Sequence, residues 1–425
     1  MTLLRYEVIL ETATISGGES MSSRKVMRVE RHIQVHSVVC ESWCRKAGLL
    51  YNYCNYQLRQ SFFATGNLPD KYELIRQLTV ENQPDYRALP AQTAQQTILK
   101  LYTNWKAFLA ACKVYKTNPE GFLGRPKPPK YKHDKKQSVL VFTNQQCKIR
   151  DGYVHFPKMV GFEPVKTAVT SDQLREVRIS PQATCHVIEA VYEKVIDVTA
   201  LPEENVLAID LGLDNLATCV NNVGEQPFIV SGKPLKALNQ FYNKRKATLQ
   251  RYIGMGTSKR IQRLTFKRNQ RVQDYLHKTS RIIVNYCIAH HIGLIVIGKN
   301  PQWKQGVRLG KRTNQQFVNV PFATLIHMVA YKAEIVGMKV VCHEESYTSK
   351  CDHLAFEPMK HQETYRGKRV TRGLFQSSVG RLLSADVNGA IGIGRKVVGD
   401  DFIWSLLNSG GVLTPVKIQL LTKGL

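Results

Sequence analysis

The order of elements that the sequence predicts after residue 205 constrains the fold of this chain most strongly. Apolar runs of β type are followed there by long stretches with helical periodicity. In chain order, the predicted elements are strands at 206–210, 216–221 and 227–231, helical stretches through 290, a strand at 293–297, a helix at 321–336 and a strand at 338–342. This order predicts an open α/β sheet, in which a functional site lies at the carboxyl ends of the strands.

Two short segments far apart in the chain have the character of two halves of one metal site. The first, 205–218, is an apolar run that ends in Asp210 and is followed by a glycine turn and a second apolar run. The second, 383–391, sets Asp386 inside a helix-like stretch of small residues. Such carboxylates can converge on Mg²⁺, which prefers oxygen ligands. Two ions about 3.5–4 Å apart clamp the attacking and leaving oxygens in phosphodiester hydrolysis.

Each aspartate also has an ordinary structural interpretation. An Asx turn can follow a strand, and an aspartate can cap a helix. For either residue alone this interpretation is preferred, whereas the pair, in a chain this basic, favours a metal site. The element order is that of an RNase H-like α/β domain, and Asp210 falls at the strand ends of such a sheet.

The charge balance indicates a polyanionic partner. The 425 residues include 60 Lys and Arg against 33 Asp and Glu, a formal net charge of +27. Phosphate contacts would dominate the affinity of such a chain. No apolar run approaches the length of a membrane span, and the N-terminus lacks the layout of a signal peptide. The ten cysteines form no CxxC pair, which indicates reduced thiols in a cytoplasmic protein, and the expected location is the nucleoid.

The first half of the chain divides into a strand-rich part and a helical part. Residues 1–25 carry Gly and Ser and are predicted to be disordered, and Met21 is an alternative start to Met1. A strand near 26–35 and four short strand-like runs between 138 and 198 predict a small antiparallel barrel. Helical patterns at 38–65, 69–80 and 91–117 interrupt it.

Two segments are densely basic. Prolines keep 121–133 extended, and its interleaved Lys, Arg, Tyr and His suit a phosphate backbone, although a solvated linker would look similar. The region 244–281 carries many cations and little acid. A solvated helix face normally mixes charges of both signs, so this density of one sign favours nucleic acid.

Several motifs resemble the TnpB family of transposon-encoded proteins, which are similar to the ancestors of type V CRISPR effectors. They are Ile209-Asp-Leu-Gly-Leu-Asp-Asn-Leu-Ala217, Tyr275-Leu-His-Lys-Thr-Ser280, Ser346-Tyr-Thr-Ser-Lys350 and Ala385-Asp-Val-Asn-Gly-Ala390. The likeness spans about 26–418. It implies a β-barrel wedge domain (26–37 and 121–204), a helical recognition domain (38–120), a RuvC-like nuclease domain (205–345 and 381–425) and a degenerate zinc-ribbon-like insert (346–380).

The resemblance also implies a function. Members of the family are RNA-guided DNA endonucleases that need Mg²⁺, for which Mn²⁺ can substitute. The implied partners are a guide RNA from the transposon end and a target DNA duplex with a short adjacent motif. A homodimer or a companion transposase is a further expectation.

The chain departs from the family pattern at two places. The family usually carries a Glu after the strand that corresponds to 295–297, where this chain has Gly298. The family also often carries a Cys₄ zinc ribbon, whereas Cys351 stands alone here and Ser377 occupies the place of a later cysteine. We therefore expect no zinc, because a tetrahedral zinc site needs such pairs. The segment 351–380 is expected to be a metal-free basic loop.

The missing Glu allows two interpretations. Either the site is inactive and the protein is an RNA-guided DNA binder, or another acid substitutes. Glu344 and Glu345 follow the strand that ends at Cys342, which neighbours the strand ending at Ile297 in an RNase H-like sheet. Two exposed glutamates at a strand end are also common. We favour Glu345 over Glu344, and hence Asp210, Glu345 and Asp386 as catalytic and metal-binding residues.

The resemblance and the basic segments together give a set of expected nucleic-acid contacts. The residues are Arg59, Lys127, Lys130, Tyr131, Lys259, Arg263, Lys267, Arg268, Arg271, His277, Lys278, Lys368, Arg369 and Arg372. The leading functional hypothesis is guided DNA cleavage, the second is a nuclease-dead guided repressor, and the third is an accessory factor of a transposase.

Overall fold

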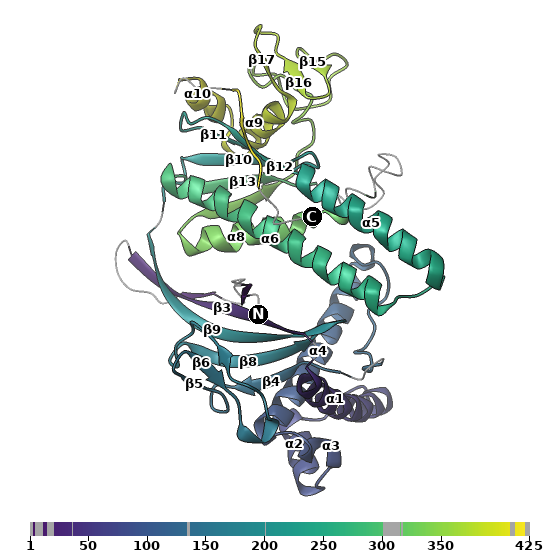
Figure 1. Ribbon diagram of the computed structural model, residues 1–425. Coiled ribbons are helices and arrows are strands. Elements are labelled where there is room, and N and C mark those ends of the chain that lie inside the picture. Colours follow the sequence, from purple (N-terminus) through teal and green to yellow (C-terminus); the bar gives the residue numbers. More distant parts are fainter. Residues whose placement is uncertain are drawn as a thin grey trace. The chain divides into compact units, whose positions relative to one another are not determined.

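The structure is a computed structural model of the 425-residue chain. It describes residues 3–4, 12–14, 21–35, 37–133, 137–199, 201–300, 315, 318–408 and 413–420. The chain forms two compact units, which are considered separately below (Figure 1). The first comprises Met1–Ala13 and Lys25–Val195, and the second Thr14–Arg24 and Ile196–Leu425. The finer division into four domains stays a prediction.

An open sheet forms the base of the first unit. It runs in the order β1 (Leu3–Leu4), β3 (Met21–Val35), β9 (Cys185–Thr199), β8 (Leu174–Pro181), β4 (Leu140–Thr143), and β2 (Thr12–Thr14) also pairs with β3. Strands β5 (Lys148–Arg150), β6 (Tyr153–His155) and β7 (Val165–Lys166) form a separate small sheet. Of the predicted disordered segment 1–25, the described residues 3–4, 12–14 and 21–25 lie in strands, and the others are outside the described residues.

The prediction of antiparallel strands in this unit is confirmed, but the prediction of a barrel is wrong, because the strands among the described residues do not close into one. Helix α4 packs on β4, and α1 packs on β8 and β4. Buried residues such as Leu140 and Ile179 of the sheet share one core with Trp43 and Trp105 of the helices. Because helices bury this face of the sheet, the sheet does not need to close on itself.

The helices of this unit follow the predicted pattern. They are α1 (Val38–Thr65), α2 (Lys71–Val80), the short α3 (Pro84–Arg87) and α4 (Ala91–Thr117). Ser37 caps α1 by accepting a hydrogen bond from the Cys40 backbone N–H, and Gly66 ends it in the left-handed conformation. The side chain of Trp105 is fully buried against α1, where its indole N–H donates to Asn55 at 3.0 Å.

A mixed six-stranded sheet forms the centre of the second unit. Its order is β14 (Lys339–His343), β13 (Leu294–Gly298), β10 (Val206–Asp210), β11 (Asn215–Asn221), β12 (Phe228–Ser231), β18 (Val416–Ile418). Strands β10, β13 and β14 are parallel neighbours, and β11 is antiparallel to β10. The predicted order of strands and helices after residue 205 is therefore confirmed.

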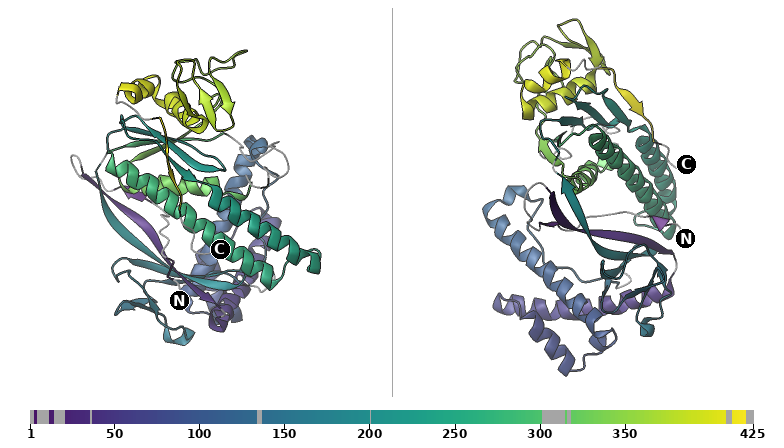
Figure 2. Two further views of the ribbon diagram at one scale, coloured as in Figure 1. Left: turned by 45° about the horizontal axis from the view of Figure 1, so that its top comes forward. Right: turned by 90° about the vertical axis from the view of Figure 1, so that its left-hand side faces the viewer.

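Helices cover both faces of this sheet (Figures 1 and 2). One side carries α5 (Lys233–Ile253), α6 (Lys259–Ala289) and α8 (Phe322–Ile335), and the other carries α9 (Ala385–Val398) and α10 (Asp401–Asn408). Helix α9 packs across β10 and β11. No helix in the described part of the chain is long and apolar enough to cross a membrane.

The segment 351–380, predicted as a basic loop, is folded. Together with the strand that follows it, as far as residue 384, it forms a small unit that we call the knuckle. Strands β15 (Lys368–Thr371), β16 (Leu374–Gln376) and β17 (Leu382–Ser384) form a three-stranded antiparallel sheet. The side chain of Asp352 is fully buried and accepts hydrogen bonds from Ser377 Oγ at 2.7 Å, from the Ser378 backbone N–H at 2.6 Å and from Ser378 Oγ at 2.8 Å. These bonds tie the start of the knuckle to its end, which is what shared zinc ligands do in a ribbon.

We predict that the purified protein contains no stoichiometric zinc and that chelation leaves its thermal midpoint unchanged. The free energy of unfolding of the Asp352→Ala variant should be lower by about 1–3 kcal/mol, because the substitution leaves the buried Ser377 hydroxyl without its acceptor. Elemental analysis of dialysed protein and thermal unfolding with and without EDTA test this. One retained zinc per chain would contradict the prediction.

Candidate functional site

Asp210 ends β10 at the edge of the sheet where the parallel strands finish. Its carboxylate lies against the backbone of Gly389 in α9, where a Cβ atom would be 2.8 Å from Oδ2. Burial, together with the nearby charges of Glu345 and Asp386, raises the pKa of Asp210 to about 7, while Arg369 of β15 acts in the opposite direction. Among the described residues, no hydrogen-bond donor contacts this carboxylate. In this arrangement the ionised form of Asp210 is unfavourable, and a bound cation would stabilise it.

Asp386 lies in the first turn of α9, which packs across β10 and β11. Its Oδ2 accepts a hydrogen bond of 2.5 Å from the side-chain amide of Asn215, the first residue of β11. Small residues on α9 allow the helix to approach the sheet closely, since a side chain at Gly389 would collide with Asp210. The two aspartates predicted from distant segments are thus brought to one place.

Glu345 approaches the same place from the strand beyond β13. It follows β14 by two residues, and β14 pairs with β13 in a register that sets Gly298 opposite His343. A Cβ atom on Gly298 would lie 2.7 Å from Glu345 Oε2. The Glu345 carboxylate therefore occupies the space beside the position where a carboxylate was expected and is missing.

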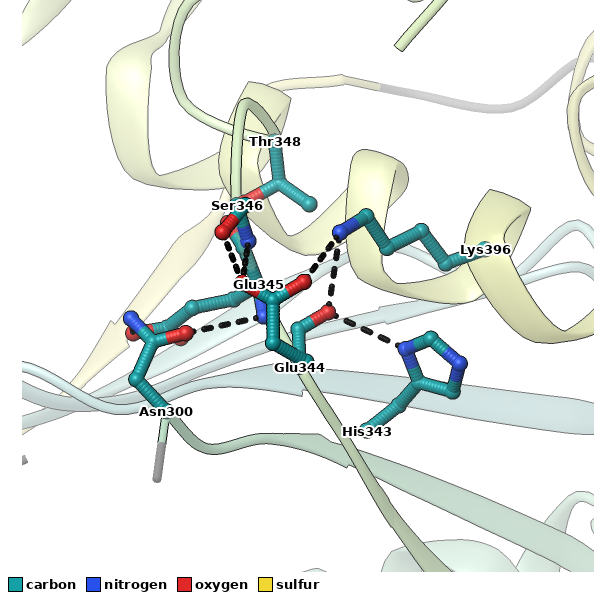
Figure 3. A network of polar contacts seen from close by, with 7 residues as sticks. All are labelled: Asn300, His343, Glu344, Glu345, Ser346, Thr348 and Lys396. Carbon is teal, nitrogen blue, oxygen red and sulfur yellow. Dashed lines mark hydrogen bonds and ion pairs between the residues drawn. The ribbon is translucent and has the colours of Figure 1, made fainter. Parts of the chain in front are cut away.

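An amide clamp holds Glu345 (Figure 3). Asn300 donates from Nδ2 to Glu345 Oε1 at 3.0 Å, and its Oδ1 accepts from the Glu345 backbone N–H at 3.2 Å. Burial raises the pKa of Glu345, the charge of Glu344 raises it further, and Lys396 acts against both. A nearby cation would therefore stabilise the ionised form of Glu345, whose carboxylate is already held in place.

Glu344 lies in a different environment from its neighbour. Its Oε2 pairs with Lys396 Nζ of α9 at 2.9 Å, and its Oε1 accepts from the Ser346 backbone N–H at 2.9 Å and from the Ser346 hydroxyl (Figure 3). The hydrogen bond and charge of Lys396 lower the pKa of Glu344. Because its charge is already neutralised, Glu344 is less suited than Glu345 to hold a metal.

Asp210 interacts electrostatically with Glu345 and with Asp386, but the three carboxylates do not have the geometry of a metal coordination site. In the described part of the chain, no three His, Cys, Asp or Glu side chains are arranged as metal ligands. Like charges repel, and two of the carboxylates instead accept hydrogen bonds from Asn215 and Asn300. The ligand roles of Asp210, Glu345 and Asp386 accordingly stay predictions.

The predicted nucleic-acid contacts divide into exposed and engaged side chains. Lys127, Lys130, Lys259, Lys267, Lys368, Arg369 and Arg372 are exposed. Arg263, also exposed, and His277 take part in other contacts of the fold. The carbonyl of His277 accepts from Lys332 at 2.9 Å, and Lys278 pairs with Asp274 at 2.7 Å. Arg59 and Tyr131 contact each other through a cation–π arrangement at 5.1 Å.

Arg268 is the clearest case of an engaged cation. Its Nε donates to Asn239 of α5 at 2.8 Å, its Nη2 donates to the Asn319 carbonyl at 2.8 Å, and its guanidinium lies 5.5 Å from the ring centre of Tyr242. It therefore ties α6 to α5 and to the segment before α8. The helical periodicity of the sequence did not reveal this role, because the partners are far away in the chain.

Neutralising Lys267 and Arg271 together should lower the slope of log affinity against log salt by about 2 for duplex DNA, because each phosphate contact contributes about 0.9. Arg268→Ala should instead lower the thermal midpoint and change the slope little. Binding titrations at several salt concentrations and thermal unfolding separate the two effects. An unchanged slope for the double variant would show that Lys267 and Arg271 do not contact phosphates.

Sequence reasoning did not find Asn215, Asn300 or Lys396. The position of Asn300 directly after a predicted strand was a usable signal, since polar residues at strand ends line sites in open α/β sheets. Lys396 lies in the last turn of α9, where a cation usually serves the helix dipole, so its pairing with Glu344 could not be anticipated.

Comparisons with known proteins agree with this architecture. Residues 189–304 match a family model described as a probable transposase, and 322–393 match one described as Cas12f1-like, TNB domain. A TnpB-like protein, ORF457 of Acidianus two-tailed virus, is 24% identical over 391 residues, covering 82% of this chain and 81% of that protein. A Cas12f1–sgRNA–target DNA complex contains a chain with a TM-score of 0.52 and 14% identity, covering 83% of this chain and 81% of the other.

The fold defines a mixed α/β protein with the architecture of Cas12f1-like chains. Within that class, the two matched segments and the TnpB-like relative point to the same family. Together these findings support a protein of the TnpB family.

Proposed function

We propose that this protein is a transposon-encoded, RNA-guided DNA endonuclease that depends on Mg²⁺. The observation that carries the proposal is the position of Glu345 beside Gly298, within electrostatic range of Asp210 at the end of β10. It supplies a third carboxylate to a RuvC-like site that would otherwise have two.

The donor set fits hard divalent cations. Asp210, Glu345 and Asp386 offer only oxygen, and burial together with mutual repulsion makes the ionised state of Asp210 costly until a cation is present. Mg²⁺ or Mn²⁺ bound there would supply Lewis acidity toward a phosphodiester and toward water. Asn215 and Asn300 orient two of the carboxylates, and Lys396 keeps Glu344 out of the site.

The proposed partners are a guide RNA and a target DNA duplex. The Cas12f1 chain that shares this fold was solved with an sgRNA and target DNA, and the excess of cations here suits two polyanions. The direct test is cleavage of a target library by the chain copurified with RNA transcribed from beyond the end of its gene. A second copy of the chain or a companion transposase remains a further proposed partner.

A nuclease-dead, RNA-guided DNA-binding protein is the second candidate. Gly298 favours it, because the expected carboxylate is missing there. Guide-matched binding without cutting in either Mg²⁺ or Mn²⁺ would select this candidate. The third, an accessory factor of a transposase, predicts neither guided binding nor cutting.

The raised pKa of Asp210 makes stability depend on both pH and divalent cations. The pKa is raised from 3.8 to about 7, so the native state holds a proton that the unfolded chain has already lost between these values. Stability should therefore fall as the pH rises through this window, by on the order of 4 kcal/mol in total. A cation that binds the ionised site should offset this cost, mainly at pH 7 and above.

We expect MgCl₂ to raise the thermal midpoint clearly at pH 8 and little at pH 5. In Asp210→Asn, the midpoint without metal should be higher than in the parent at pH 8, and the increment due to Mg²⁺ should shrink. Thermal unfolding across this pH range measures both effects. An equal Mg²⁺ increment in parent and variant would place the cation elsewhere.

A further inference from the structure

The basic segment 125–133 is held along helix α1 by side chains of that helix. Asn52 contacts Lys132 twice, donating from Nδ2 to the Lys132 carbonyl at 3.0 Å and accepting the Lys132 backbone N–H on Oδ1 at 2.7 Å. Asn55 and Arg59 both donate to the carbonyl of Pro129, at 3.0 Å and 2.8 Å. The three anchoring side chains share one face of α1, because their spacing follows the helical repeat.

Aromatic rings and prolines reinforce this attachment. The Arg59 guanidinium lies 5.1 Å from the ring centre of Tyr131, and Lys132 Nζ lies 4.6 Å from that of Tyr51. Prolines at 126, 128 and 129 restrict the backbone further. Burial also lowers the pKa of Lys132, which is consistent with its inward position. The conformation of the segment is thus fixed by the protein rather than by a ligand.

The side chains that are not used for anchoring are cations on the outside. Arg125, Lys127, Lys130 and His133 are exposed, whereas Tyr131 and Lys132 are partly buried. Lys127 and Lys130 are three residues apart, which corresponds to about 9 Å along an extended backbone. A row of cations on a backbone that is ordered before binding loses little entropy when it meets a chain of phosphates.

We propose that residues 125–133 form a preorganised phosphate rail for a nucleic-acid backbone. Lys127 and Lys130 contact the phosphates, and Asn52 and Arg59 are positioning residues that hold the rail. This assigns Arg59 a different role from the direct contact that its charge suggests. The proposal rests on the proposed nucleic-acid partner, but it does not depend on whether the carboxylate site cuts.

The test measures binding of the full-length chain in EDTA, so that cleavage plays no part. The probes are a labelled single-stranded RNA and a labelled DNA duplex of equal length, titrated at several salt concentrations. The variants are Lys127→Ala with Lys130→Ala, and Asn52→Ala alone. A matched control, Lys106→Ala with Lys113→Ala, removes the same charge from exposed positions on α4.

The lysine double variant should bind about tenfold more weakly at low salt, and its salt slope should fall by about 2 on duplex DNA or about 1.4 on RNA. Asn52→Ala should weaken binding several-fold with an unchanged slope, because every charge remains but the rail must be ordered on binding. The control should shift both quantities less. The probe that shows the effect identifies the strand that the rail holds.

Two results would overturn the rail. In the first, the parent binds both probes but the lysine double variant behaves like the control. In the second, Asn52→Ala binds as tightly as the parent, which would show that the clamp does not matter. If the parent binds neither probe, both the rail and the proposed nucleic-acid function fail.

Discussion

Asp210→Asn and Asp386→Asn are each expected to reduce guided DNA cleavage by about a hundredfold or more, while guided binding stays near the parent level. Each change removes one carboxylate from the shared site and no cation from the nucleic-acid surface. Cleavage and binding of the same guide-matched duplex, measured in Mg²⁺ and in Mn²⁺, test the expectation.

Asp214 provides the matched control, because it lies in the turn that follows β10, close to Asp210 in the chain, but is already paired with Lys236 at 2.8 Å. Asp214→Asn should keep most of the cleavage rate. If Asp210→Asn or Asp386→Asn cuts at the parent rate, the site lies elsewhere. If all three variants lose cutting equally, the loss is not specific to the carboxylates of the proposed metal site.

Glu345→Gln should eliminate cleavage and keep both the fold and guided binding. The substituted amide keeps the shape of the side chain but removes the charge that lies closest to Gly298 and raises the pKa of Asp210. Glu344→Gln should have a smaller effect, since it breaks only a partly exposed ion pair with Lys396, worth about 0–1 kcal/mol.

Gly298→Ala tests the same geometry without touching an acid. The new Cβ would lie 2.7 Å from Glu345 Oε2 and 2.5 Å from Ile393 Cδ1, so Glu345 must move and cleavage should fall. Reversed effects of the two glutamine variants would mean that Glu344 is the functional acid. If both variants cut normally, the relocated carboxylate is not used. A parent that never cuts a matched target would select the nuclease-dead candidate.

The sequence by itself determined the local elements and the position of the two aspartates. The helix at 38–65 was predicted with the bounds that α1 has, because the helical periodicity on which the prediction rests is a local property of the sequence. The strands after residue 205 were found for the same reason, since short apolar runs between turns need no distant partner to be recognised. A strand-end Asp210 and a helical Asp386 followed directly from these elements.

The tertiary structure decided what depends on contacts between distant residues. Closure of the first sheet could not be known from strands alone, because helices α1 and α4 bury the face that a barrel would otherwise enclose. Arg268 was expected to contact phosphate, yet its hydrogen bonds to Asn239 and Asn319 join three helical segments. Lys396, in a helix some fifty residues further along the chain, pairs with Glu344 and so distinguishes its role from that of Glu345. Pairing of this kind follows from packing in three dimensions, which periodicity along one chain does not encode.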